Sequence, residues 1–235
     1  MQRAITVSCD IFFYTLADKL GITRIDNLLS KFGFGEPTGI DIEEELSGVL
    51  ASPEWKQKAK GAHWYEGDTI NASIGQGFMQ STPLQLASAA STLANHGNRM
   101  VPTLLLGMRE IDSSYTPQAP MPLEPIELRK EIWDEVIKDM QSVIDSPEGT
   151  ARRFGPHPDY TVAGKTGTAQ VYYKNYIRGH DQQKNLPEKL RDHSLFIAFA
   201  PVEAPKIAIA VVVENSTDSI LIARKIFDYY LGPKI

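Results

Sequence analysis

The last third of the chain constrains the fold most, because strand-forming residues dominate three separate segments there. Val, Ile, Thr and aromatic residues are concentrated in Tyr160 to Tyr173, Ser194 to Pro201 and Lys206 to Glu214. Such runs predict β-strands. A final apolar stretch, about Ser219 to Leu231, predicts a closing helix. Because helical patterns precede the strands, the order favours an α/β (α+β) fold with helices packed on an antiparallel sheet.

Helical spacing of apolar residues dominates the earlier part of the chain. The clearest start signal is Thr82-Pro83-Leu84-Gln85, which combines a Thr cap, a Pro at the first helical position and a Gln three residues after the cap. Segments rich in Gly, Pro or charge are expected to be loops, namely Gly35 to Gly61 and Ser113 to Pro125. The expected helices are Asp10 to Leu20 with Gly21 as the stop, Ile25 to Phe32, Thr82 to near Gly97, and Leu128 to Ile144.

The composition excludes several classes of protein. With 235 residues, 42% of them hydrophobic, the chain is long enough for one large domain or two small ones. The excess of 29 acidic over 24 basic residues argues against a nucleic-acid-binding protein. Cys9 is the single cysteine, so the chain has no internal disulfide and no cysteine-based zinc site. The longest apolar run, Ile207 to Val213, is far shorter than the roughly 20 residues that cross a bilayer.

The triplet Gly164-Lys165-Thr166 has two interpretations. It resembles the end of a phosphate-binding P-loop, but that motif requires a Gly five residues before Gly164, where the chain has Asp159. A P-loop also continues into a helix, whereas Ala169 to Tyr173 is strand-like. The P-loop interpretation is therefore rejected.

The second interpretation is the K-T-G element of serine penicillin-recognising enzymes, which lies on a strand. Alternation along a strand puts the hydroxyls of Thr166 and Thr168 on one face, where they are able to bind a carboxylate. Lys165 adds positive charge beside that anion, and Gly167 leaves room for close approach. By itself the triplet is weak evidence, because an ordinary strand also contains Gly and Thr.

A second motif, Ser8-Cys9-Asp10, lies upstream at the start of an expected helix. Its order and context match the S-x-N element that accompanies K-T-G. With this agreement the chain resembles the class B penicillin-binding proteins, most closely their elongation-type group, penicillin-binding protein 2. The segments that carry the resemblance are Thr6 to Tyr14, Gly33 to Gly35 with Thr38 to Asp41, Ile74 to Gly77 with Thr82 to Ala87, Ala163 to Gln170, and Phe196 to Pro201.

The resemblance implies a fold and a reaction. The fold is the β-lactamase/transpeptidase-like domain, of which residues 1–235 are the C-terminal part, incomplete at the N-terminus. The reaction is D,D-transpeptidation, in which a serine attacks the penultimate D-Ala carbonyl of a stem peptide and releases the terminal D-Ala. The acyl group then passes to an amine on a neighbouring strand. No cofactor and no metal are implied.

The resemblance also assigns roles to residues of both motifs. Ser8 relays a proton between the general base and the substrate, Lys165 holds it in register, and Asp10 hydrogen-bonds the substrate amide or a neighbouring side chain. Thr166, Gly167 and Thr168 bind the substrate, and Thr168 supplies one backbone N–H of the oxyanion hole. One departure concerns Asp10, since many relatives have Asn there and an ionised Asp accepts but cannot donate.

The expected partners follow from the resemblance alone. They are peptidoglycan stem peptides ending in D-Ala-D-Ala, β-lactam antibiotics, a membrane glycosyltransferase and the rod-shape complex, with no nucleic acid. The expected location is the periplasmic face of the bacterial inner membrane, reached through an anchor upstream of this chain.

The first motif of the family, S-x-x-K, does not occur in the chain. No Ser has a Lys three positions later, and in Ser52-Pro53-Glu54-Trp55 the lysine, Lys56, comes one place too late. We therefore expect the acylating serine and its lysine to lie upstream of residue 1. The chain alone is then inactive, and the strand Lys206 to Glu214 lacks a neighbour, which favours low solubility.

Two other functions remain as alternatives: a serine β-lactamase or β-lactam sensor of the same fold, and a non-catalytic interaction fragment. The turn at Gly75-Gln76-Gly77 is expected to be structural. The polar stretch Lys174 to His193 is expected to be a solvated loop or a flap over the substrate groove. The histidines have no metal-ligand spacing; they are His63, His96, His157, His180 and His193.

Overall fold

The computed structural model describes residues 1–111, 114–156, 159–171 and 186–232. Its helices are α1 (Gln2–Thr6), α2 (Asp10–Leu20), α3 (Ile22–Lys31), α4 (Pro53–Lys60), α5 (Glu66–Ala72), α6 (Pro83–Ala94), α7 (Lys130–Asp145) and α9 (Ser219–Leu231), with short 3-10 helices η1 (Arg152–Phe154) and η2 (Glu188–Leu190). Its strands are β1 (Arg99–Met100), β2 (Gly107–Met108), β3 (Thr116–Pro117), β4 (Pro122–Leu123), β5 (Ala163–Ala169), β6 (His193–Ala200) and β7 (Ile207–Val213).

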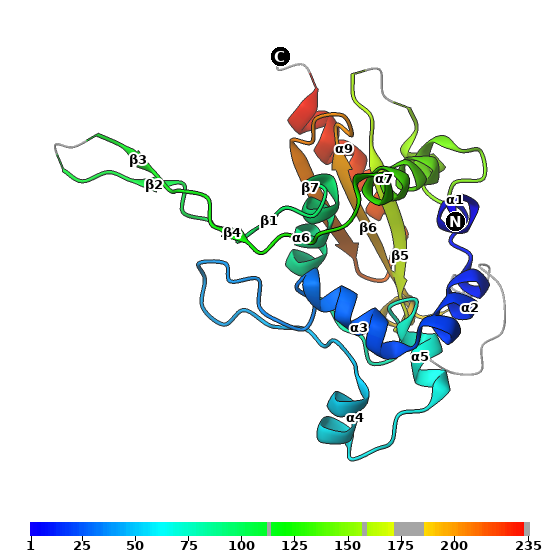
Figure 1. Ribbon diagram of the computed structural model, residues 1–235. Helices are drawn as coiled ribbons and strands as arrows, with labels where there is room; N and C mark the ends of the chain where they lie inside the picture. The colour runs from blue at the N-terminus through cyan, green and yellow to red at the C-terminus, as the bar shows by residue number, and fades with distance from the viewer. Residues whose placement is uncertain (112–113, 157–158, 172–185, 233–235) are drawn as a thin grey trace.

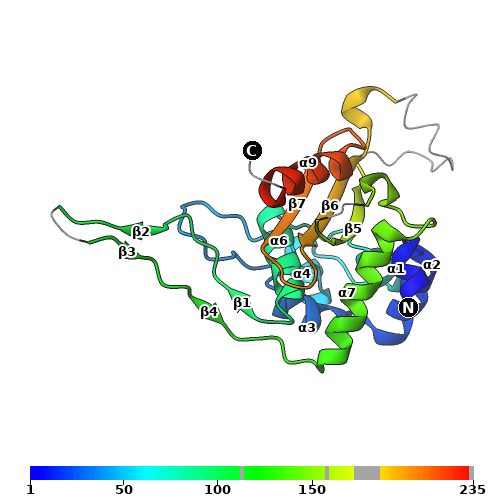
Figure 2. The ribbon, with the colours of Figure 1, turned by 90° about the horizontal axis from the view of Figure 1, so that it is seen from above.

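A three-stranded antiparallel sheet in the order β5-β6-β7 forms the centre of the molecule (Figure 1). Thr166 of β5 lies opposite Phe196 of β6, which in turn lies opposite Val211 of β7. Helix α9 covers one face of the sheet, while α6 and α7 cover the other (Figure 2). The predicted fold class, an antiparallel sheet flanked by helices, is confirmed.

The core lies on both faces of β6. Successive side chains of a strand point to opposite faces. Phe196 belongs to a buried cluster with Phe227 of α9, whereas Phe199 belongs to a second cluster with Met140 of α7. All three Phe side chains are fully buried, and β6 is apolar from Leu195 to Ala200, where helices cover it on both sides.

Gln85 of α6 connects the helix to two places in the loop between α3 and α4 through a buried side chain. Its Oε1 accepts from the backbone N of Thr82, while Thr82 Oγ1 accepts from the backbone N of Gln85, so the predicted capping box is present. Gln85 Nε2 also donates to the carbonyl oxygens of Glu36 at 2.8 Å and Ser47 at 2.7 Å. Gly48 is required beside it, since a Cβ there would lie 2.4 Å from the carbonyl oxygen of Gln80.

The expected loop Gly35 to Gly61 is wrong over its last part, which forms α4. Ser52 Oγ accepts from Trp55 N at 3.1 Å, and Pro53 takes the first helical position. Gly61 ends the helix in the left-handed conformation. These are the start and stop signals that correctly predicted α6, so the helix was predictable from the sequence.

An extended arm lies between α6 and α7, and the segment expected to be irregular, Ser113 to Pro125, contains two of its short strands, β3 and β4. Its short strand pairs, β1 with β4 and β2 with β3, project away from the sheet (Figure 1). Asp41 holds the arm at its base: its carboxylate accepts from Thr103 Oγ1 and from the backbone N of Leu104 and Leu105. These hydrogen bonds lower the pKa of Asp41 to about 2.

Several expectations end near the limits of the described ranges. The helix expected from Ile25 begins earlier, at Ile22, and β5 covers only the centre of the expected strand Tyr160 to Tyr173. Most of the expected flap, residues 172–185, lies outside the described residues. Among the described residues no strand pairs with the outer side of β7, as expected, while the predicted low solubility stays a prediction. In the described ranges no helix is both long and apolar enough to span a membrane.

Replacing Gln85 tests its bridging role. Gln85→Leu leaves two partly buried carbonyl groups of the loop between α3 and α4 without this donor, and each unsatisfied group costs about 1–3 kcal/mol. Because these groups are only partly buried, we expect the free energy of unfolding in urea to fall by roughly 2 kcal/mol. The matched control is Gln57→Leu on the exposed face of α4, with an expected change within about 0.5 kcal/mol. Equal effects of the two substitutions would show that the buried amide does not hold the loop.

Candidate active site

Ser8 lies in the turn between α1 and α2 with its backbone in the left-handed region, at φ 54°. The turn is a Schellman motif: Cys9 N donates to Ala4 O at 2.8 Å, and Ser8 N donates to Ile5 O at 3.2 Å. Glycine is the usual residue at the position of Ser8, because a Cβ is disfavoured there by about 1–2 kcal/mol. A serine in this place therefore adopts a backbone conformation that is unusual for a residue with a side chain.

Lys165 of β5 connects the sheet to this turn. Its Nζ donates to Ser8 Oγ at 2.9 Å and to Thr166 O at 2.9 Å. The two predicted motifs, 157 residues apart in the chain, therefore meet through a direct hydrogen bond. Asp10, the first residue of α2, lies close enough for its negative charge to act on Lys165.

Burial controls the protonation of Lys165. Removal of its ammonium group from water lowers the pKa of Lys165 to about 8, from an ordinary value of 10.5. The negative charge of Asp10 acts in the opposite direction and raises this pKa, but by less than burial lowers it. The site thus contains an amine that gives up its proton far more readily than an ordinary lysine.

The three predicted substrate-binding residues lie along the outer edge of β5. Gly167 and Thr168 are exposed, and Thr166 is half-buried. The Thr166 and Thr150 hydroxyls are 2.8 Å apart, so Thr150, which follows α7, supports the predicted hydroxyl face. β6 pairs with one side of β5, and in the described ranges no strand pairs with the other side.

Sequence reasoning missed two contacts at this edge. Gln76 Nε2 donates to Thr168 O at 2.7 Å, and Thr150 bonds Thr166. The interpretation of Gly75-Gln76-Gly77 as a tight turn agrees with positive φ angles at both glycines, but the Gln side chain has an additional partner. A contact between residues 92 positions apart leaves no periodic signal in the sequence.

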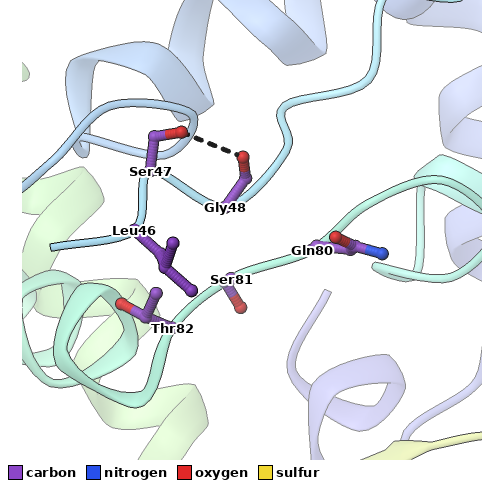
Figure 3. Close-up of a pocket in the computed structure, with 6 residues that line it drawn as sticks. All are labelled: Leu46, Ser47, Gly48, Gln80, Ser81 and Thr82. Carbon is purple, nitrogen blue, oxygen red and sulfur yellow. Dashed lines mark hydrogen bonds between the residues drawn. The ribbon is translucent and has the colours of Figure 1, made fainter. Parts of the chain in front are cut away.

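A hollow of about 280 Å³ lies apart from these residues, beside the loop that Gln85 holds. Figure 3 shows the residues that line it, Leu46, Ser47, Gly48, Gln80, Ser81 and Thr82. None of the predicted site residues lines it. It also contains no titratable side chain, and we therefore take the β5 edge, not this hollow, as the candidate site. In the described ranges no three His, Cys, Asp or Glu residues form a metal-binding group.

The model of the penicillin binding protein transpeptidase domain matches residues 1–231 of the chain. The chain belongs to this transpeptidase family. It is 40% identical to the peptidoglycan D,D-transpeptidase MrdA of Salmonella typhimurium LT2 over 240 residues, which cover 100% of this chain and 38% of that protein. The chain thus spans well under half the length of this relative.

Solved structures of transpeptidase family members agree. Pseudomonas aeruginosa PBP2 in complex with WCK 5153 has a TM-score of 0.79 and 39% identity, covering 98% of this chain and 49% of that chain. Helicobacter pylori PBP2 in complex with MreC has a TM-score of 0.79 and 29% identity, covering 98% and 40%. The predicted resemblance to penicillin-binding protein 2 is confirmed.

A pair of substitutions isolates the backbone strain at Ser8. Ser8→Ala and Ser8→Gly both remove the hydroxyl that Lys165 contacts, but only Gly relieves the left-handed conformation. We expect the Gly variant to be more stable than the Ala variant by about 1 kcal/mol in urea unfolding. Equal stabilities of the two variants would show that the turn is not strained.

Neutralising Asp10 tests its electrostatic effect on Lys165. Because the Asp10 charge raises the pKa of Lys165, Asp10→Asn is expected to lower that pKa below about 8. The measurement is the pH dependence of the Lys165 side-chain ¹⁵N shift. Asp18→Asn, on the same helix, is the control and should leave the value unchanged. An unchanged or higher pKa in the Asp10 variant would contradict the assignment.

Proposed function

We propose that this chain supplies the substrate-binding side of a peptidoglycan D,D-transpeptidase active site. The observation that carries the proposal is the 2.9 Å hydrogen bond from Lys165 Nζ to Ser8 Oγ, in a chain of the transpeptidase family. Residues 1–235 are, in this proposal, the C-terminal part of one domain, and the S-x-x-K serine lies on a preceding segment.

The proposed reaction forms a bond from that serine oxygen to the penultimate D-Ala carbonyl carbon. The bond to the terminal D-Ala nitrogen breaks, and the serine proton passes to this leaving amine. An acceptor amine then attacks the ester carbonyl carbon, the bond from that carbon to the serine oxygen breaks, and the proton lost by the amine returns to the serine oxygen, which leaves the cross-linked amide. Ser8 relays the proton between the general base and the substrate, and Lys165 holds Ser8 in register through its hydrogen bond to Ser8 Oγ.

The outer edge of β5 is the proposed binding surface for the stem peptide. An extended peptide adds to an open strand edge through main-chain hydrogen bonds. The exposed N–H of Thr168 is the proposed oxyanion donor, and loss of one such donor typically lowers the rate by about 100-fold to 1000-fold. Thr166 and Thr168 hydroxyls, with Lys165, bind the terminal carboxylate, and Asp10 bonds a substrate amide or a neighbouring side chain.

The proposed ligands and partners follow from the proposed transpeptidase function. β-Lactams bind as stem-peptide analogues. The named relatives are peptidoglycan D,D-transpeptidases, which favours this function over a β-lactamase, a β-lactam sensor or a non-catalytic fragment. The H. pylori relative is solved in complex with MreC, which supports a rod-shape complex with a glycosyltransferase as the proposed assembly. The proposed location is the periplasmic face of the inner membrane.

Labelling with a fluorescent penicillin tests the proposal. The protein expressed from the full reading frame that contains this chain should be labelled, and excess unlabelled penicillin should prevent it. The 235-residue chain alone should remain unlabelled, since loss of the nucleophile in a serine enzyme costs on the order of a millionfold. A label mapped by mass spectrometry to any residue of this chain, or no labelling of the longer protein, would overturn the proposal.

A further inference from the structure

Side-chain donors occupy two carbonyl groups of the β5 edge. Thr166 O accepts from Lys165 Nζ at 2.9 Å, and Thr168 O accepts from Gln76 Nε2 at 2.7 Å. Open strand edges normally pair with another strand or with water. At the edge that the proposed function assigns to the peptide, groups of the same chain therefore satisfy these two carbonyl oxygens.

Only the side chain of Gln76 takes part in the hydrogen bond to Thr168, since its backbone has other partners. Its backbone N donates to Asn71 O at 3.0 Å, which fixes the turn to the end of α5. Two residues further on, Phe78 packs against Trp55 with ring centroids 5.5 Å apart. Contacts on both sides of Gln76 therefore fix the backbone of the turn. The side-chain amide of Gln76 is exposed where it bonds Thr168 of the sheet. The side chain is able to leave Thr168 without disturbing the backbone.

The geometry of an antiparallel strand makes this bond compete with a ligand. The N–H and C=O of one strand residue point to the same side, and a hydrogen-bonded pair of residues exchanges both bonds. A ligand residue whose carbonyl accepts from Thr168 N therefore directs its own N–H at Thr168 O. Gln76 Nε2 lies in that position, 2.7 Å from Thr168 O.

We propose that Gln76 is a placeholder: its amide satisfies Thr168 O until the N–H of an extended acyl ligand replaces it. This inference rests on the proposed function and deepens it, because it assigns a specificity role to a residue outside the three family motifs. Ligands with an N–H donor next to the reacting carbonyl restore the displaced hydrogen bond. Ligands without that donor displace Gln76 and leave Thr168 O unsatisfied.

Substitution of Gln76 is expected to raise the rate of acylation, whereas substitution of a residue that only supports the fold would lower it. A placeholder slows ligand entry, so Gln76→Ala and Gln76→Asn, which is one methylene shorter, should acylate faster. The net value of one hydrogen bond corresponds to an increase of about 2-fold to 10-fold. A residue that only supports the fold would give a decrease in both variants.

The measurement is the second-order rate constant of acylation by benzylpenicillin, whose side-chain amide has the required N–H. It uses the protein from the full reading frame, with Gln80→Ala as the matched control, since the Gln80 side chain lines the separate hollow. A rise in both Gln76 variants with no change in the control supports the proposal. A fall or no change overturns it. A wild-type protein that is not acylated at all overturns the proposed function, and the placeholder role with it.

A crystal structure of the acylated wild-type protein gives an independent answer if the variants do not fold. We expect Gln76 Nε2 to lie beyond hydrogen-bond distance from Thr168 O, with the penicillin amide nitrogen in its place. A Gln76 amide that still bonds Thr168 O in the acyl-enzyme would overturn the placeholder role, whatever the kinetics of the variants.

Discussion

The hydrogen bond from Lys165 Nζ to Ser8 Oγ is the contact on which the candidate site depends, because it joins the helical N-terminal turn to the central sheet. Two unfavourable local features accompany it. Ser8 has the left-handed backbone conformation that favours glycine, and Lys165 is withdrawn from water, which lowers its pKa. Proteins keep such features where the surrounding structure enforces them, most often at functional sites. Their coincidence at one hydrogen bond supports assignment of this place as the active site.

The rest of the structure holds the two sides of this site in place. On one side, β6 pairs with β5 and is buried between α9 and the helices α6 and α7, so the edge of β5 has a rigid base. On the other side, the Lys56–Asp68 ion pair, at 2.6 Å and largely buried, connects α4 to the start of α5. The turn that presents Gln76 follows α5. The polar groups at the edge of β5 therefore come from two parts of the structure that are held in place independently, the sheet and the turn after α5.

The prediction of elements from sequence succeeded where local signals were strong and consistent. The capping box at Thr82 and Gln85, the stop at Gly21 and the strand-forming segments of the last third all correspond to observed elements. The helix α4 was missed although Ser52, Pro53 and Gly61 carry the same signals, because Gly and Pro elsewhere in that segment indicated a loop. The arm between α6 and α7 was missed because two-residue strands are too short to show an alternating pattern.

The sequence by itself determined the class of fold, the family resemblance and the identity of the two motifs, because those depend on residue type and on spacing within short segments. Tertiary structure alone decided which groups meet. Lys165 reaches Ser8 across 157 residues, and Gln76 reaches Thr168 across 92. Folding also determined the lowered pKa of Lys165, since desolvation depends on everything packed around the amine rather than on its neighbours in sequence.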